Sequence, residues 1–396
     1  MRILVVDDDP LTLELLGAAL RKWGHEVETA SDGEEAWKSF QQNPAPMLLS
    51  DWMMPLCDGI ELCRRIREAD SDIYTYFIMI TAKRERDDLI AAIEGGADDF
   101  LVKPVFIDEL RAKIHAGQRI LKLQSDLSAQ LNKLSIVNMQ MRRDLEAAAR
   151  IQQSLLPTSA PQVPHFACAW FYDPCSHVAG DIMNIIRLDE KTLGIYVLDV
   201  AGHGVPAALL AVSVSRILTP QREWGGMLKR PLDEPPYYEI AAPAEVADRL
   251  NASFPLTESN RQYFTILYGT LDMRAYEFRY AQAGHPGPLV LWPGGQALDF
   301  PRGEAAIGFF ENEEYIEKTI ALEVGARLFL YSDGVIETAN ASRDQFGIER
   351  LKQAASDSRA LPLDQSVAFI RQRVADWRGE LEGEDDATLL ALEILP

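Results

Sequence analysis

The sequence predicts a multidomain protein: a doubly wound α/β domain with a parallel five-stranded sheet, then a long coiled-coil helix, then an α+β layered β-sandwich domain. A length of 396 residues exceeds what one ordinary hydrophobic core supports. Strand-like and helix-like stretches alternate in the first part of the chain, whereas short strands dominate the last part, and an uninterrupted amphipathic stretch separates the two. We therefore expect domains at 1–118 and 157–396, joined by a helix over 119–156.

The first domain is predicted from apolar runs that alternate with amphipathic stretches. The expected strands are residues 2–8, 25–30, 46–51, 75–82 and 98–104, and the expected helices are residues 11–24, 33–42, 59–70, 86–96 and 106–118. Repeated alternation of this kind favours a parallel sheet with helices on both faces. Such a sheet carries its site at the carboxyl ends of the strands.

The joining helix is predicted from apolar residues that recur every three or four positions without an intervening glycine or proline. These residues are Ile120, Leu123, Leu127, Leu131, Leu134, Val137, Met141, Leu145 and Ala148, and we expect the helix to end at Pro157. A helix of about 40 residues would be about 60 Å long, which is too long for one domain to cover. The near-heptad spacing favours a parallel coiled coil that makes a homodimer through residues 119–156; a helix packed back on its own domains is the alternative.

The last domain is predicted from many short strands with a few helices among them. The expected strands are residues 165–173, 182–189, 192–200, 263–272, 276–284, 288–294, 315–323, 327–333 and 387–395, and the expected helices are 203–218, 243–253, 346–356 and 363–378. This pattern is typical of an α+β layered domain. The stretch 219–243 is rich in proline and glycine, and it is either a flap beside the site or an inert insertion.

Composition excludes several classes of function. A formal net charge of −21, with no basic helix closing the chain, argues against nucleic acid as a partner. No apolar run approaches the roughly 18 residues that span a bilayer, and the N-terminus becomes acidic too early for a signal peptide, so we expect no membrane partner and a cytoplasmic protein. The cysteines, Cys57, Cys63, Cys168 and Cys175, lack the spacing of a zinc site and are expected to be reduced thiols.

An acidic constellation marks the first domain. Asp7 and Asp8 follow one apolar run, Asp51 follows another, and Lys103 follows a third. Like charges in one crevice repel each other unless a divalent cation or the lysine neutralises them. The pattern therefore predicts a magnesium ion held by Asp7, Asp8, Asp51 and the backbone carbonyl of Met53.

Phosphoryl chemistry is the use this arrangement favours. Asp51 would be the nucleophile that takes a phosphoryl group, with Lys103 stabilising the developing charge. Thr81 would then donate its hydroxyl to a phosphoryl oxygen in the modified state.

The motifs VVDDD, SDWMMPLCDG, ITA and DDFLVKP, in this order, resemble the receiver domain of two-component response regulators. The resemblance implies that Asp51 is the phosphoacceptor and that Phe100 is the aromatic side chain that moves with Thr81. A receiver-like fold that is never phosphorylated would normally lack one of these groups.

A second acidic constellation marks the last domain. Asp181, Asp199, Asp333 and Asp385 each stand at the edge of an apolar strand-like run, with a glycine or a second carboxylate within three residues. Carboxylates at strand ends can converge on hard divalent cations, which prefer oxygen ligands. Two bridged cations would position water for in-line attack on a phosphoryl group, without a covalent enzyme intermediate.

The order AGD, DVAGHG, FTILYG, AGHPGP, YSDGVIE and DDAT, with RIQQSLLP ahead of it, resembles the metal-dependent (PPM-type) serine/threonine protein phosphatases in their SpoIIE-like branch. The resemblance implies two Mn²⁺ or Mg²⁺ ions. Their ligands would be Asp181, Asp199 as the bridge, the backbone carbonyl of Val200, Asp333 and Asp385.

The sequence leaves the roles of several neighbours of these ligands open. Asp386 can substitute for Asp385 as a ligand. Asn184 stands where the family often has a second aspartate, and this replacement would weaken the binding of one metal ion. His203 is either a phosphate contact or proton donor, or a histidine that bonds the backbone of its glycine turn, and we expect the latter role for His285. Spacing singles out none of the arginines Arg216, Arg261 and Arg302 as a phosphate ligand.

Together the resemblances imply a response regulator whose output is metal-dependent dephosphorylation of phosphoserine or phosphothreonine on a regulatory protein, controlled at Asp51. They imply a sensor histidine kinase upstream and a STAS-type anti-sigma-factor antagonist as substrate. The alternative is a catalytically inactive pseudo-phosphatase adaptor that binds a protein partner under receiver control. The presence of all the expected metal carboxylates favours the enzyme. A nucleotide cyclase is disfavoured because AGD lacks the surrounding acidic signature.

Overall fold

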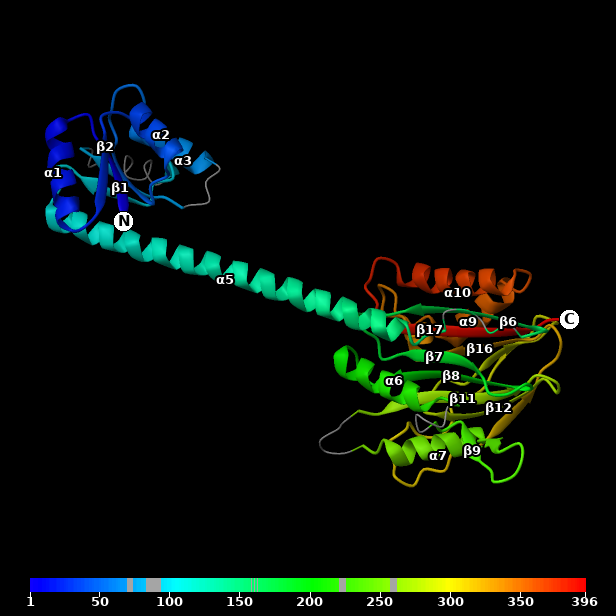
Figure 1. The fold of residues 1–396 in the computed structure, drawn as a ribbon. Helices are drawn as coiled ribbons and strands as arrows, with labels where there is room; N and C mark the ends of the chain where they lie inside the picture. Colours follow the sequence, from blue (N-terminus) through cyan, green and yellow to red (C-terminus); the bar gives the residue numbers. More distant parts are fainter. Residues whose placement is uncertain are drawn as a thin grey trace. The chain divides into compact units, whose positions relative to one another are not determined.

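A computed structural model describes residues 1–69, 74–82, 94–157, 159, 161, 163–220, 226–256 and 262–396 (Figure 1). The chain divides into two compact units, residues 1–139 and 140–396. No helix in the described ranges is both long enough and apolar enough to cross a membrane. The four cysteines are free thiols, and Cys57 and Cys63 are buried.

The first unit is built on a parallel sheet, as the strand-helix alternation predicts. Its strands are β1 (Arg2–Val6), β2 (Glu26–Ala30), β3 (Met47–Asp51), β4 (Tyr76–Thr81) and β5 (Asp99–Val102), in the order β2-β1-β3-β4-β5. Helices α1 (Pro10–Lys22), α2 (Gly33–Gln42) and α3 (Gly59–Glu68) each begin after an aspartate. Asp9, Asp32 and Asp58 accept backbone N–H groups of the first turns, which fixes where each helix starts. The helix predicted over 86–96 falls mostly outside the described residues.

Helix α5 (Ile107–Gln153) is 47 residues long. The helices expected over 106–118 and 119–156 form one continuous helix, which begins at Ile107 and ends before Pro157, since residues 154–156 form a turn. Gly117 lies within the helix without interrupting it. A side chain at this position would lie 2.5 Å from atoms of Met47 and Tyr76, so glycine lets the helix pack closely on the sheet.

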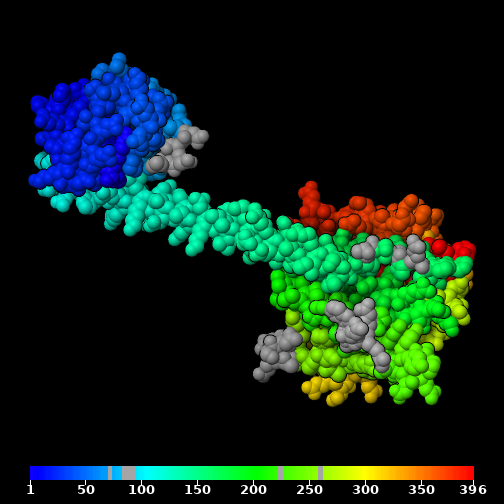
Figure 2. Space-filling view, in the orientation of Figure 1, coloured from blue at the N-terminus to red at the C-terminus, as the bar shows by residue number. Residues whose placement is uncertain are grey.

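The middle of α5 packs against nothing else in the described chain. Residues 122–144 are all exposed, and the side chains of Leu127 and Leu134 keep 54% and 57% of their surface in water (Figure 2). An apolar stripe left in water over this length is typical of a helix that has a partner.

The second unit contains two facing antiparallel sheets. One has the order β15-β12-β11-β8-β7 and the other β14-β13-β16-β17-β6. The first consists of β7 (Ile182–Arg187), β8 (Thr192–Val200), β11 (Phe264–Asp272), β12 (Glu277–Ala283) and β15 (Lys318–Ala321). The second consists of β6 (Phe166–Asp173), β13 (Leu289–Leu291), β14 (Ala297–Asp299), β16 (Arg327–Tyr331) and β17 (Ala387–Ile394).

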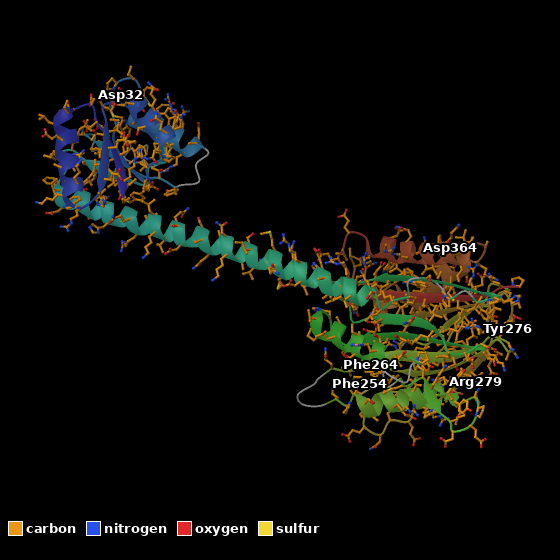
Figure 3. All side chains as sticks on the ribbon, viewed as in Figure 1. Asp32, Phe254, Phe264, Tyr276, Arg279 and Asp364 are labelled. Atoms are coloured by element: carbon orange, nitrogen blue, oxygen red, sulfur yellow. The ribbon has the colours of Figure 1, made fainter. Side chains whose placement is uncertain are left out.

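Three hydrophobic clusters hold these layers together. Val197 and Met183 from one sheet and Leu328 and Leu390 from the other belong to the cluster between the sheets. Helices α6 (Val205–Ile217) and α7 (Pro243–Ser253) cover the first sheet, and α9 (Gly347–Asp357) and α10 (Leu363–Arg378) cover the second (Figure 1). At the C-terminal end of α7, Phe254 packs edge to face on Phe264, with the ring centroids 5.7 Å apart (Figure 3). The layered α+β sandwich is therefore confirmed.

Some short elements were not predicted. The stretch 219–243, expected to be a loop, contains the hairpin of β9 (Lys229–Pro231) and β10 (Tyr238–Ile240), with residues 221–225 outside the described chain. Strand β14 and helix α8 (Asp333–Glu337) were also missed. These elements have three to five residues, too few to show a periodic pattern.

Candidate metal centres

The first candidate centre lies at the carboxyl ends of β1, β3 and β5. Ligand oxygens of Asp7, Asp8 and Asp51 lie within 4.8 Å of one another. Lys103, directly after β5, places its Nζ 2.9 Å from Asp7 Oδ2 and 3.0 Å from Asp51 Oδ2. Parallel strands end at the same edge of the sheet, which is why residues from three separate segments meet here. The third carboxylate of the run, Asp9, caps α1 instead.

The electrostatics of this centre match a site that needs a cation. Burial raises the pKa of Asp51, while its hydrogen bond with Lys103 opposes that shift. Burial disfavours the Lys103 ammonium, but the bonds to Asp7 and Asp51 outweigh it and raise the lysine pKa. Three carboxyl groups face one ammonium, so the trio has room for a divalent ion, which binds carboxylate oxygens.

The remaining receiver residues lie around Asp51. Thr81 ends β4 with a buried side chain, and its carbonyl accepts the backbone N–H of Lys103 at 2.7 Å. Phe100 lies on β5, half-buried, with Lys113 Nζ 5.3 Å from its ring centroid. The Met53 side chain is 65% exposed, so only its backbone is suited to a role in the crevice.

The second candidate centre lies at one end of the sandwich, where β7 and β17 begin and β8 and β16 end. Asp181 directly precedes β7, and Asp199 lies at the end of β8, its antiparallel neighbour. Asp333 begins α8 just after β16, and Asp385 precedes β17, which pairs with β16. Each sheet therefore brings two carboxylates to the same edge.

Mutual charge shows that these side chains share one crevice. Loss of hydration, then the charges of Asp333 and Asp385, raises the pKa of Asp199 to about 8. Loss of hydration and the charge of Asp333 likewise raise the pKa of Asp385 to about 6. Among the described residues of this unit, no three acidic side chains approach as closely as the Asp7 trio does.

Asp181 provides the clearest fit for a cation. Its side chain is fully buried, and its Oδ2 accepts a hydrogen bond from Ser332 Oγ at 2.7 Å. Its Oδ1 is buried and makes no hydrogen bond of normal geometry in the described chain, although the neighbouring Thr388 hydroxyl favours the ionised carboxylate. Burial, then the charge of Asp199, raises the pKa of Asp181 well above its ordinary value. A buried carboxylate oxygen without a partner is costly unless it binds a proton or a metal ion.

The structure corrects the expectation for Asp386. This side chain was expected to be able to replace Asp385, but it is 3% exposed and both its oxygens are occupied. Oδ1 accepts the N–H of Cys175 at 2.7 Å, and Oδ2 accepts the N–H of Gly180 at 2.6 Å. Asp386 therefore anchors the loop that carries Asp181.

The structure also corrects the expectation for Asn184. Strand β7 places Asn184 opposite Tyr196, on the face that α6 and α7 cover, whereas Met183 and Val197 face the other sheet. Because successive side chains alternate between faces, Asp181 lies on the Met183 face and Asn184 does not. The Asn184 Oδ1 accepts the N–H of Ile185 at 2.8 Å. Asn184 is thus not brought to the acidic crevice.

The two histidines differ in burial. His203 is exposed in the turn between β8 and α6. His285 is fully buried, and its Nδ1 lies 2.8 Å from Thr265 Oγ1, so it bonds a side chain on β11 rather than the backbone of its own turn as expected. Burial lowers the pKa of His285 to about 3, which keeps the ring neutral.

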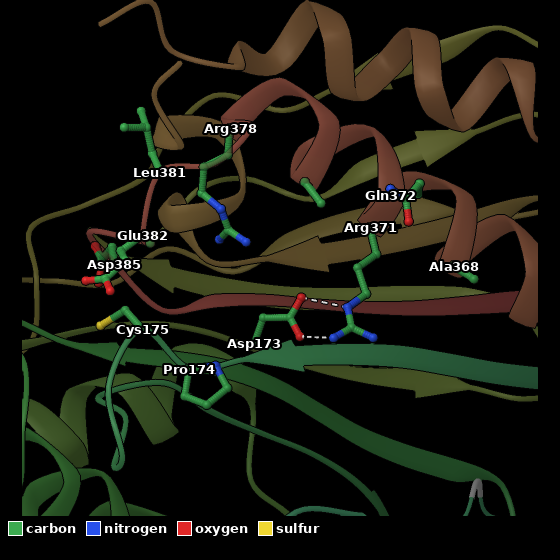
Figure 4. A pocket seen from close by; sticks show the side chains of 12 residues that line it. Asp173, Pro174, Cys175, Ala368, Arg371, Gln372, Arg378, Leu381, Glu382 and Asp385 are labelled. Atoms are coloured by element: carbon green, nitrogen blue, oxygen red, sulfur yellow. Dashed lines mark hydrogen bonds and ion pairs between the residues drawn. The ribbon is translucent and has the colours of Figure 1, made fainter. Parts of the chain in front are cut away.

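Two cavities reach the acidic crevice from the α10 side, and Asp385 and Arg378 line both. One, of about 770 Å³, also includes Asp173, Cys175 and Arg371 (Figure 4). The other, of about 880 Å³, extends past α8. The Arg371 guanidinium pairs with the Asp173 carboxylate, and its Nε donates to Oδ2 at 2.7 Å.

Two arginines therefore lie close enough to meet a ligand at the crevice. Arg378 has a buried Nε without a partner in the described chain. Arg302 Nη2 lies 4.0 Å from Asp333 Oδ2 and 3.4 Å from Glu337 Oε1. Sequence spacing did not single out either one; Arg216 lies on α6, and Arg261 is outside the described residues.

Comparison with known proteins assigns both units. The response regulator receiver domain model matches residues 3–115, and the model of stage II sporulation protein E (SpoIIE) matches residues 189–395. Fold and site together define a receiver domain joined to a PP2C-type phosphatase domain. The chain belongs to the stage II sporulation protein E family, whose model covers more than half of it.

Individual relatives resemble one unit or the other. The transcriptional regulatory protein TcrA of Mycobacterium tuberculosis is 40% identical over 119 residues, covering 30% of this chain and 46% of TcrA. The response regulator MprA of Mycobacterium ulcerans is 39% identical over 129 residues, covering 33% of this chain and 55% of MprA. The chain thus spans about half the length of these curated relatives.

The SiaA-PP2C domain of Pseudomonas aeruginosa matches with a TM-score of 0.54 at 22% identity, covering 65% of this chain and 98% of that domain. At this identity the likeness establishes the fold of the second unit.

Proposed function

We propose that this protein is a phosphorylation-controlled protein phosphatase that hydrolyses phosphoserine or phosphothreonine on a regulatory protein. The observation that carries the proposal is the convergence of Asp181, Asp199, Asp333 and Asp385 from two facing sheets, with a buried Asp181 oxygen left without a partner. The PP2C-type relationship implies dependence on a divalent metal. The functional division into residues 1–118, 119–156 and 157–396 is part of the proposal.

The second unit would bind two Mn²⁺ or Mg²⁺ ions. Asp181, Asp199, Asp333, Asp385 and the Val200 carbonyl are the proposed ligands, and the bound ions would lower the pKa of water and stabilise charge on the phosphoryl oxygens. The chain itself would hold the ligands in position, because Ser332 and Asp386 fix the segment that carries Asp181.

Arg302 and Arg378 lie where a substrate phosphate would approach, and they would orient it. For His203 we propose contact with the substrate phosphate and no proton transfer.

The first unit would receive a phosphoryl group from a sensor histidine kinase. Asp7, Asp8, Asp51 and the Met53 carbonyl are the proposed ligands of Mg²⁺. An Asp51 carboxylate oxygen attacks phosphorus, the bond from phosphorus to the donor imidazole nitrogen breaks, and Lys103 offsets the added charge.

Thr81 and Phe100 would then respond to the new phosphoryl oxygens. The resulting signal would pass through a homodimer formed along residues 119–156, in the cytoplasm.

The substrate class is proposed by analogy with the family. A STAS-type anti-sigma-factor antagonist is the substrate we propose, and its dephosphorylation would free it to bind an anti-sigma factor. The net charge of −21 leaves no role for nucleic acid in this proposal.

The test is phosphate release from a phosphoserine protein by the purified full chain, in Mn²⁺ or Mg²⁺, with and without beryllofluoride at Asp51. Metal-dependent turnover that is lost in Asp199→Ala is expected, and a change with beryllofluoride would give the sign of control. Absence of turnover with both metals, while beryllofluoride is bound, would instead support the pseudo-phosphatase adaptor.

A further inference from the structure

We propose that Gln152, near the end of helix α5, is a positioning residue that holds the metal ligand Asp181 in place, so that movement of α5 changes metal binding in the second unit. The inference rests on the proposed function, because it takes Asp181 as a metal ligand. Gln152 belongs to RIQQSLLP, a stretch to which the chemistry described above gives no task.

The Gln152 side chain forms a two-bond clamp on the backbone of one residue, Ala179. Its Nε2 donates to the Ala179 carbonyl at 2.6 Å, and its Oε1 accepts the Ala179 N–H at 3.0 Å. The side chain is 3% exposed, so water does not compete for these bonds. A side-chain amide both donates and accepts, whereas a leucine does neither and a carboxylate only accepts.

The clamped residue lies directly before the candidate ligand. Gly180, between Ala179 and Asp181, donates its N–H to Asp386 at 2.6 Å. A side chain on Gly180 would lie 2.8 Å from the Val200 carbonyl, so this backbone is pressed against the end of β8. The segment is thus held by α5, by the residue before β17 and by β8, and only the α5 contact belongs to a helix that continues into the first unit.

The surroundings of Gln152 make it the point of transmission. Ile151 and Gln153 on either side of it are exposed, while Leu155 and Leu156 pack against the hydrophobic clusters of the sandwich. A rotation or shift of α5 would pull on the Ala179 peptide through two short bonds, and Asp181 would move with it. A role limited to fastening the helix end would affect stability but leave metal affinity unchanged.

Metal affinity of the full-length protein is therefore the measurement. Mn²⁺ binding would be followed by calorimetry in wild type, Gln152→Leu, Gln152→Glu and the matched control Gln153→Leu, which alters an exposed neighbour of the same chemistry. Substitution of a residue that orients a metal ligand typically lowers metal affinity about 10- to 100-fold. We expect a loss of about tenfold or more in Gln152→Leu, a smaller loss in Gln152→Glu, which keeps the acceptor, and none in Gln153→Leu.

Two further readouts separate the outcomes. Urea unfolding in EDTA identifies a variant that fails to fold; if Gln152→Leu does, the Gln152→Glu measurement decides. The ratio of phosphatase rates with and without beryllofluoride at Asp51 is expected to approach one in both Gln152 variants.

Folded Gln152 variants that bind Mn²⁺ as tightly as the control would overturn the inference. A wild type that binds Mn²⁺ in a Gln152-dependent way but releases no phosphate would overturn the proposed function and leave the clamp standing.

Discussion

Neighbouring aspartates with opposite tasks give the sharpest test of the site. Asp386→Ala would leave the backbone N–H groups of Cys175 and Gly180 without their acceptor, at a position that is 3% exposed. The Gly180 N–H is buried, and a buried N–H without a partner costs about 1–3 kcal/mol, whereas the Cys175 N–H is partly buried and water can replace its acceptor. The variant should therefore lose about 1–3 kcal/mol of stability. Relief of repulsion with the other carboxylates favours the lower part of that range.

Asp385→Ala removes a charge from the same crevice at a different cost. Asp385 is exposed, and its one backbone contact, the Asp386 N–H at 2.8 Å, is only partly buried, so water can replace it. Since its pKa is raised to about 6, the ionised carboxylate is disfavoured in the folded metal-free protein, and its removal should be neutral or slightly stabilising.

The assay is urea unfolding of the full chain in EDTA at pH 7, with calorimetric Mn²⁺ binding on the same samples. Asp386→Ala should unfold at clearly lower urea, whereas Asp385→Ala should unfold like wild type yet bind less Mn²⁺. Identical unfolding midpoints for the two variants would refute the assignment of Asp386 to the loop and of Asp385 to the metal.

Other predictions concern protons, the helix and the receiver. The pKa of Asp199 (about 8) and that of Asp385 (about 6) lie above 3.8, so the folded metal-free protein holds extra protons; its stability should fall as pH rises from 5.5 to 8.5 in EDTA, and Mn²⁺ should reverse this in thermal melts. Leu127→Lys with Leu134→Lys should halve the mass seen by light scattering without lowering the melting temperature, unlike Ser128→Lys, which should stay dimeric. Gly59→Ala puts a Cβ 2.3 Å from the Asp51 carbonyl, so it should cost about 1–3 kcal/mol and slow Asp51 phosphorylation by acetyl phosphate.

Much of the fold followed from residue patterns because long, periodic segments determine it locally. Strands such as 192–200 and helices such as 363–378 were predicted with their observed bounds. The acidic residues were predicted at strand ends, and the sheet topology brings them to shared edges. The start of α5 was predicted as a separate helix over 106–118, and the structure joins it to the next helix through Gly117, which lies close to Met47 and Tyr76.

The errors at the site have different physical origins. The position of Asn184 away from the acidic crevice could have been predicted, since an odd separation from Asp181 along a strand points the two side chains to opposite faces. The tasks of Asp386 and Gln152 were not, because each depends on backbone groups more than 25 residues away in the chain. No local pattern reports such contacts.

The length of α5 also has a consequence for how this architecture can vary. Gly117, which packs on the first sheet, and Gln152, which clamps the Ala179 peptide, are 35 residues apart, and this distance is five heptads. In a supercoiled helix with a seven-residue repeat, both therefore occupy the same heptad position, beside the apolar seam. Related chains that lengthen or shorten this helix by seven residues would keep both contacts in phase, whereas a gain or loss of two or five would turn one of them to the opposite side of the helix.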